Sequence, residues 1–219
     1  STLDRSSAAS DVYKRQSVLS KSFAIVREDL HRLYGAACDA ATIDSILDDV
    51  IAELSSSAKV TNFLPVLAER EATERIKAAS GCKDFAPRQE ILFADSRGSG
   101  RSQIATALAY HLAGDEVFIR TIGLTPEDGL NPRVVEALHD RGVDTSRLTQ
   151  KTITPRVSHR ADVVVLMGIE ETPAVPGDRY VEWDVADPDN LADDELQSLI
   201  DDIETRLRAL FTEMDVAVA

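Results

Sequence analysis

The sequence predicts an α/β domain, built on a four-stranded parallel sheet flanked by helices, preceded by an all-α domain of three helices. Three observations support this. Residues 17–80 show apolar side chains at helical spacing, whereas residues 89–215 alternate short apolar runs with amphipathic segments. The 219 residues are 43% hydrophobic, which is enough to form a core in each part. Alternating strands and helices predict a parallel sheet with both faces covered.

The all-α part contains three helical patterns. Thr42 is a plausible N-cap of the second, and the third, Phe63–Lys77, tolerates Pro65 in its first turn. Three such helices make a thin bundle of about 60 residues, so we expect a partner surface and a homodimer formed through residues 17–80. The repeating apolar positions are Phe23, Val26, Leu30, Leu33 and Tyr34 in the first pattern and Ile43, Ile46, Leu47, Val50, Ile51 and Leu54 in the second.

The remaining boundaries come from composition. Residues 1–16 are polar, aperiodic and rich in serine, which predicts a disordered or non-native tail. Residues 81–88 are expected to be a linker. In the α/β domain the expected strands are 91–94, 117–119, 162–167 and 180–183, and the expected helices are 102–112, 132–141 and 191–214. Ligands in such sheets bind at the carboxyl ends of the strands, where the strand order reverses.

Charge and cysteine content exclude several classes of function. The net charge of −14 argues against nucleic acid or an anionic membrane as a partner. Most of the excess lies in residues 178–215, which fits a solvated face on the last helix. No stretch is apolar enough for a membrane span or a signal peptide, so a cytoplasmic protein is expected. Two cysteines, Cys38 and Cys82, make neither a disulfide scaffold nor a cysteine-rich metal site, and no metal site is predicted.

The segment Asp95–Ser102 directly follows the first predicted strand and leads into a helix. Its glycines and serines allow successive backbone N–H groups to surround an oxyanion, with the helix N-terminus and an arginine adding positive charge. An ordinary Gly/Ser turn with exposed arginines is the alternative on spacing alone. The predicted anion-binding residues are Ser96, Arg97, Gly98, Ser99, Gly100, Arg101 and Ser102.

Residues 89–214 resemble the low-molecular-weight tyrosine phosphatases and the arsenate reductases that share their fold. The resemblance rests on the loop just described and on ordered matches further along the chain. The N-terminal helices, especially the segment Val60–Leu67, resemble the three-helix extension of actinobacterial arsenate reductases of the mycothiol-transferase type, which implies dimerisation. The matching segments are 91–103, 121–123, 131–138, 141–144, 161–164, 176–177, 183–184 and 187–188.

The resemblance implies a nucleophilic cysteine six residues before Arg101, where this chain has Asp95. Thiolate chemistry needs a soft, strongly nucleophilic group at this position, and a carboxylate is a poor substitute. It would also repel an anionic ligand by roughly 4 kcal/mol at 4 Å and an effective dielectric of 20. One hypothesis is that Asp95 forms an ion pair with Arg101 and fills its own loop. Asp187, before Pro188, matches the general acid of the family.

Three interpretations of function remain open. The first is a catalytically impaired homologue that binds an anion or partner. The second is an active enzyme, either of the family's kind (an arsenate reductase of the thiol-transferase type or a phosphatase) or with a changed nucleophile, Asp95 or a serine. The third is a structural or dimer-partner role. The scattered histidines supply no obvious base, and residues 168–173 contain no cysteine for an internal thiol relay. No cofactor is expected, and an external thiol such as mycothiol would be needed only by an active enzyme. The histidines are His31, His111, His139 and His159.

Overall fold

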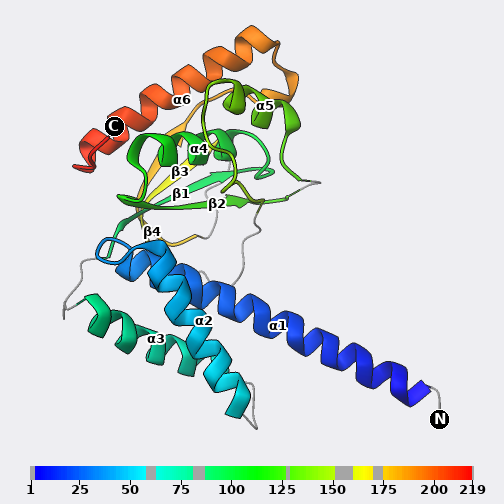
Figure 1. The fold of residues 1–219 in the computed structure, drawn as a ribbon. Coiled ribbons are helices and arrows are strands. Elements are labelled where there is room, and N and C mark those ends of the chain that lie inside the picture. Colours follow the sequence, from blue (N-terminus) through cyan, green and yellow to red (C-terminus); the bar gives the residue numbers. More distant parts are fainter. Residues whose placement is uncertain are drawn as a thin grey trace. The chain divides into compact units, whose positions relative to one another are not determined.

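The computed structural model describes residues 3–57, 63–80, 87–126, 129–150, 160–169 and 175–218, with side chains from residue 17 onward. Cys82, His159, most of the expected linker and residues 170–173 lie outside this part. The chain divides into two compact units, residues 1–88 and 89–219, and each is described by itself (Figure 1).

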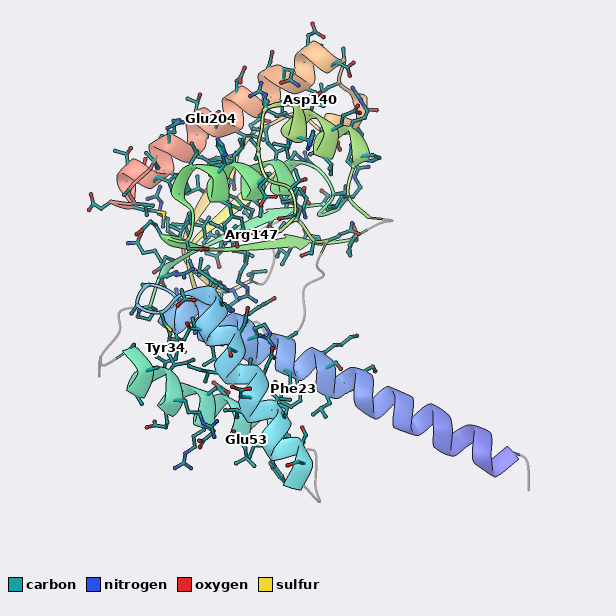
Figure 2. The ribbon with its side chains drawn as sticks, viewed as in Figure 1. Phe23, Tyr34, Glu53, Asp140, Arg147 and Glu204 are labelled. Atoms are coloured by element: carbon teal, nitrogen blue, oxygen red, sulfur yellow. The ribbon has the colours of Figure 1, made fainter. Side chains whose placement is uncertain are left out.

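The first unit contains three helices: α1 (Leu3–Tyr34), α2 (Ala40–Ser57) and α3 (Leu64–Ser80). Their core is the cluster that the helical spacing predicts, since every repeating apolar position of α1 and α2 belongs to it or packs against it. Phe23 and Tyr34 come from α1 (Figure 2). From α3, Ala68, Ala72 and Ile76 enter this core at helical spacing.

Two helix starts differ from expectation. The backbone of α1 is helical from Leu3 onward, within the segment expected to be a disordered or non-native tail. Residues 3–16 contain neither Gly nor Pro, and extending an existing helix is far easier than nucleating one. Thr42 is not the N-cap of α2, because α2 begins at Ala40. The Asp39 carboxylate caps this end, accepting hydrogen bonds from the Thr42 backbone N–H at 2.9 Å and the Thr42 hydroxyl at 2.7 Å.

The second unit is built on a parallel sheet of β1 (Gln89–Asp95), β2 (Val117–Gly123), β3 (Ala161–Met167) and β4 (Gly177–Trp183). The strand order is β2-β1-β3-β4, so the order reverses between β1 and β3. Asp95, the last residue of β1, is in register with Gly123 on β2 and Met167 on β3. The loop after β1 therefore starts at the reversal point, where the sequence places its ligand site.

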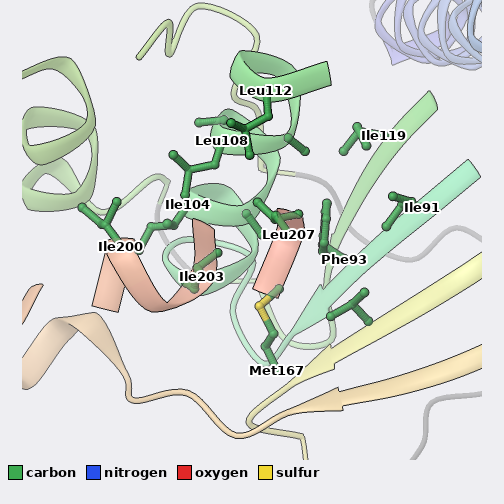
Figure 3. Close-up of a cluster of buried hydrophobic side chains, with 14 of the residues drawn as sticks. Ile91, Phe93, Ile104, Leu108, Leu112, Ile119, Met167, Ile200, Ile203 and Leu207 are labelled. Atoms are coloured by element: carbon green, nitrogen blue, oxygen red, sulfur yellow. The ribbon is translucent and has the colours of Figure 1, made fainter. Parts of the chain in front are cut away.

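The α-helices described in this unit pack on one face of the sheet (Figure 1). They are α4 (Arg101–Ala113), α5 (Pro132–Asp140) and α6 (Asp193–Glu213). Phe93 and Met167 lie in the core beneath them (Figure 3), and a smaller cluster around Leu92 and Val164 buries the opposite face. The strand pattern correctly predicts two buried faces, but it does not specify what covers each one.

An apolar patch is exposed at the start of α3. Phe63, Val66 and Leu67 are 67%, 64% and 48% exposed, and Phe63 lies about one helical turn before the adjacent Val66 and Leu67. We call these three residues the α3 patch. Among the helices described, none is both long enough and apolar enough to cross a membrane.

An ionic network joins α1 to α2. Arg27 pairs with Asp44 and Asp48, and His31 Nε2 lies 2.8 Å from Asp44 Oδ1. Burial acts to raise the pKa of Asp44, but the hydrogen bonds from His31 and Arg27 outweigh it and hold the pKa below its ordinary value. Ionised Asp44 therefore stabilises the folded helical unit.

Asp44→Asn is expected to lower the protection of α1 and α2 amides at neutral pH, measured by hydrogen exchange of the full chain. The Asp44 side chain is 42% exposed, so solvent screening limits the loss to roughly 0.5–1 kcal/mol. The stabilisation is present above the ordinary aspartate pKa and disappears as pH falls through the lowered one, so the two proteins should converge in acid. Asp49→Asn, on an exposed carboxylate of the same helix, is the control. Equal effects of both substitutions would contradict the network.

Candidate functional site

The site is the loop of residues 96–100 between β1 and α4, whose carbonyl groups point away from its centre. Each carbonyl from Ser96 to Ser99 accepts a hydrogen bond from a residue outside the loop. The donors are the Thr125 N–H to Ser96 (2.8 Å), Gln150 Nε2 to Arg97 (2.9 Å), Gln103 Nε2 to Gly98 (2.7 Å) and the Asn131 N–H to Ser99 (2.9 Å). This tethering leaves the loop's N–H groups free to converge on an acceptor.

Asp95 supplies that acceptor. The residue is only 2% exposed; Oδ1 accepts from the Gly98 N–H, and Oδ2 accepts from the Ser102 N–H at 3.1 Å. Ser102 lies in the first turn of α4, so the carboxylate also benefits from the positive end of that helix. The loop therefore holds an anion that belongs to the chain itself.

Arg101 lines the same small cavity as Asp95. Its guanidinium packs against the backbone of Gly168, where an added Cβ would lie 2.0 Å from Nη1. Within the described residues, Arg101 forms no ion pair with Asp95, so the expected pairing is wrong. The backbone N–H groups of Gly98 and Ser102, three and seven residues after Asp95, donate to the carboxylate instead, because the loop directs them at it.

Arg97 is engaged in two ion pairs that the sequence analysis missed. Nη2 lies 2.6 Å from Asp187 Oδ2, and Nη1 pairs with Asp189. Burial acts to lower the pKa of Arg97, but the charges and hydrogen bonds of Asp187 and Asp189 outweigh it and raise the pKa. Asp189 is also bound by Asn131 Nδ2 at 2.6 Å. The only sequence signal was the presence of two acidic residues around Pro188.

The space left at the centre is small. Asp95, Ser99, Arg101 and Asp187 are among the residues lining a cavity of about 10 Å³, which is the space of a single water. The three loop serines have different surroundings: the Ser96 hydroxyl donates to the Gly168 carbonyl at 3.3 Å, Ser99 lines the cavity, and the Ser102 hydroxyl is buried without a hydrogen-bond partner among the described residues. The described part of the chain holds no cluster of metal-ligating side chains.

Two family models match this chain, one in each of its two units. Residues 90–218 match the model described as low molecular weight phosphotyrosine protein phosphatase, and residues 24–80 match the protein-tyrosine-phosphatase-like N-terminal domain. The chain belongs to the low molecular weight phosphotyrosine protein phosphatase family. The family resemblance and the fold inferred from the sequence are thereby confirmed.

Similar proteins of this family are named as arsenate reductases. Arsenate reductase 2 of Staphylococcus epidermidis is 29% identical over 129 residues, covering 57% of this chain and 98% of the relative. The solved thioredoxin-dependent arsenate reductase of Corynebacterium glutamicum is 31% identical, with a TM-score of 0.52, and the match covers 88% of this chain and 96% of that one. An arsenate reductase in a phosphate-binding state shares the fold at 21% identity and a TM-score of 0.51.

Gly98 and Gly123 allow the loop to cross the end of β2. Gly98 has φ of +68°, and an added Cβ would lie 2.9 Å from the Gly123 backbone nitrogen. A Cβ on Gly123 would in turn lie 2.6 Å from the Arg97 carbonyl carbon. Neither position has room for a side chain, so the path of the loop past β2 depends on both residues being glycine.

Gly98→Ala is expected to destabilise the α/β unit by about 3 kcal/mol, because it adds a backbone collision to the cost of a positive φ. Urea unfolding followed by fluorescence measures this, since Trp183 is the chain's single tryptophan and lies in this core. Gly142→Ala is the matched control: its φ is +72° but an added Cβ meets nothing within 4 Å, so about 1 kcal/mol is expected. Equal losses would show that crowding at Gly123 is unimportant.

Proposed function

We propose that this chain is a catalytically impaired cytoplasmic member of its family, which keeps the oxyanion-binding loop and the helical extension but lacks the nucleophile. Asp95 stands where the resemblance places the catalytic cysteine and acts as a built-in anion. The observation that carries this proposal is the pair of N–H groups, from Gly98 and Ser102, that bind the Asp95 carboxylate. The protein then serves as a binding partner or an anion-responsive protein, not as a phosphatase or reductase.

The chemistry of the loop supports the proposed loss of catalysis. Arsenate reduction and phosphate transfer by a thiol both begin with attack of a sulfur atom, and the described loop offers a buried carboxylate in its place. A carboxylate bound to the same N–H groups competes directly with an incoming oxyanion. The cavity of about 10 Å³ beside it has no room for a tetrahedral anion while Asp95 stays bound.

Turnover by another nucleophile has less support. The Ser102 hydroxyl is fully buried, and that of Ser96 is directed to the Gly168 carbonyl, so neither is presented to a ligand beside a base. An aspartate nucleophile in other phosphotransferases relies on a metal to neutralise the site, and the described residues show no cluster that would hold one. An external thiol, whether mycothiol or the thioredoxin named for the Corynebacterium protein, would need a cysteine to act on.

The native protein is expected to be inactive in a para-nitrophenyl phosphate assay and in a thiol-coupled arsenate assay. Asp95→Cys is expected to gain measurable activity, because the tethered loop and Arg101 do not depend on the identity of residue 95. Asp95→Asn, which restores no nucleophile, is the matched control, and Asp95→Cys/Arg101→Gln should lose the gain. Native activity that persists in Asp95→Asn but disappears on substitution of a loop serine would contradict the proposal.

A second copy of this chain is the proposed partner, associating through residues 17–80. The α3 patch supports this, because three large apolar side chains within one helical turn are exposed on a small helical unit. No nucleic acid or membrane partner is proposed, in keeping with the net charge of −14.

Val66→Asp is expected to convert a dimer to a monomer in sedimentation velocity of the full chain at tens of micromolar, because it places a charge in the centre of the α3 patch. Val218→Asp adds the same charge to an exposed valine of the other unit and should leave the sedimentation coefficient unchanged. A native protein that sediments as a monomer under these conditions would argue against the dimer.

A further inference from the structure

The segment of residues 187–189 lies directly on the loop after β1. Pro188 Cγ is 2.6 Å from the position that a Cβ on Gly100 would occupy, so the two segments are in close contact. Asp187 and Pro188 also line the small cavity beside Asp95. This segment, a short 3-10 turn capped by Asp187, therefore forms one wall of the candidate site.

Arg97 holds this wall through two ion pairs. Its guanidinium reaches Asp187 through Nη2 at 2.6 Å and Asp189 through Nη1, so one side chain spans both carboxylates. Further hydrogen bonds fix the two carboxylates. Asp187 Oδ1 accepts from the Asp189 N–H at 3.1 Å, and Asp189 Oδ1 accepts from Asn131 Nδ2 at 2.6 Å. We call the Arg97–Asp187–Asp189 arrangement the Arg97 clamp.

We propose that the Arg97 clamp is a second, independent closure of the loop, which holds residues 187–189 over it and lowers the affinity for external oxyanions even when Asp95 is removed. The inference rests on the proposed function, in which the loop is an anion site filled by Asp95. The two closures use different atoms: Asp95 occupies the backbone N–H groups, whereas the clamp fixes the wall above them.

The clamp also removes Arg97 from anion binding. A guanidinium in the loop is the side chain that the sequence assigns to an incoming anion, yet this one is neutralised by two carboxylates. Each of these side chains is about one-third exposed or less, so solvent screens the pairs only in part. Opening the clamp must therefore precede binding, and the apparent affinity falls by the fraction of molecules that are open.

The test uses inorganic phosphate and isothermal titration calorimetry on the full chain. Asp95→Ala removes the first closure, and Asp95→Ala/Arg97→Gln/Asp189→Asn also removes the clamp while conserving the net charge of the single variant. We expect the triple variant to bind phosphate about fivefold to tenfold more tightly than Asp95→Ala. Because one positive and one negative charge are lost together, net charge cannot account for such a gain.

An ion pair on α6 provides the matched control. Arg206 Nε lies 3.0 Å from Asp202 Oδ2, with side-chain exposures of 35% and 46%, so Asp95→Ala/Arg206→Gln/Asp202→Asn loses a comparable pair without touching the clamp. Its phosphate affinity should equal that of Asp95→Ala. Trp183 fluorescence checks that every variant is folded. As a second measurement, Arg97→Gln/Asp189→Asn with Asp95 retained should raise hydrogen exchange in residues 187–192.

The outcomes separate the two proposals. Equal phosphate affinity, or no detectable binding, in Asp95→Ala and the triple variant overturns the clamp, as does unchanged exchange in residues 187–192. A native protein that binds phosphate as tightly as Asp95→Ala contradicts the built-in anion and hence the proposed function. The comparison of the single and triple variants still decides on the clamp in that case.

Discussion

The hydrogen bonds from the Gly98 and Ser102 N–H groups to Asp95 determine what this site can do. A backbone turned so that its carbonyls face outward leaves buried N–H groups facing inward, and such donors need an acceptor. In a loop of this kind a bound oxyanion can meet that need. Here the last residue of β1 meets it within the chain, so the loop keeps its shape without a ligand.

The other features of the site follow from this internal acceptor. With its centre occupied, the loop needs no arginine to balance an external charge, and Arg97 is directed to the carboxylates of residues 187 and 189. Arg101 packs on Gly168 instead of pairing with Asp95. The acidic C-terminal region affects the site mainly through these two carboxylates. Much of the remaining acidity lies on α6, where pairs such as Arg206–Asp202 are exposed and contribute little to stability.

Much of the fold could be predicted from local patterns. Helical spacing identified the core residues of α1 and α2, and short apolar runs located the four strands, because both signals repeat within a few residues. The glycines and serines after β1 marked the loop for the same reason. Composition misjudged the start of α1, since it measures polarity and not the continuation of an existing helix.

Contacts between distant residues could not be predicted in this way. Arg97 meets Asp187 and Asp189 across some 90 positions of sequence, and nothing local to either segment specifies that meeting. The same holds for the tethers from Thr125, Asn131 and Gln150. The expected pair of Asp95 with Arg101 was wrong because charge alone was considered, whereas the direction of nearby N–H groups decided the partner.

The tethering of the loop carbonyls limits how far this motif can be moved between proteins. Its shape is maintained by donors in four segments outside it: the turn after β2, the residue before α5, a loop glutamine and a buried glutamine of α4. A protein engineer who grafted residues 95–102 onto another strand and helix would transfer the glycines but none of these supports. The unit that can be transplanted is therefore the whole sheet edge, and short-motif matches alone overstate how portable such a loop is.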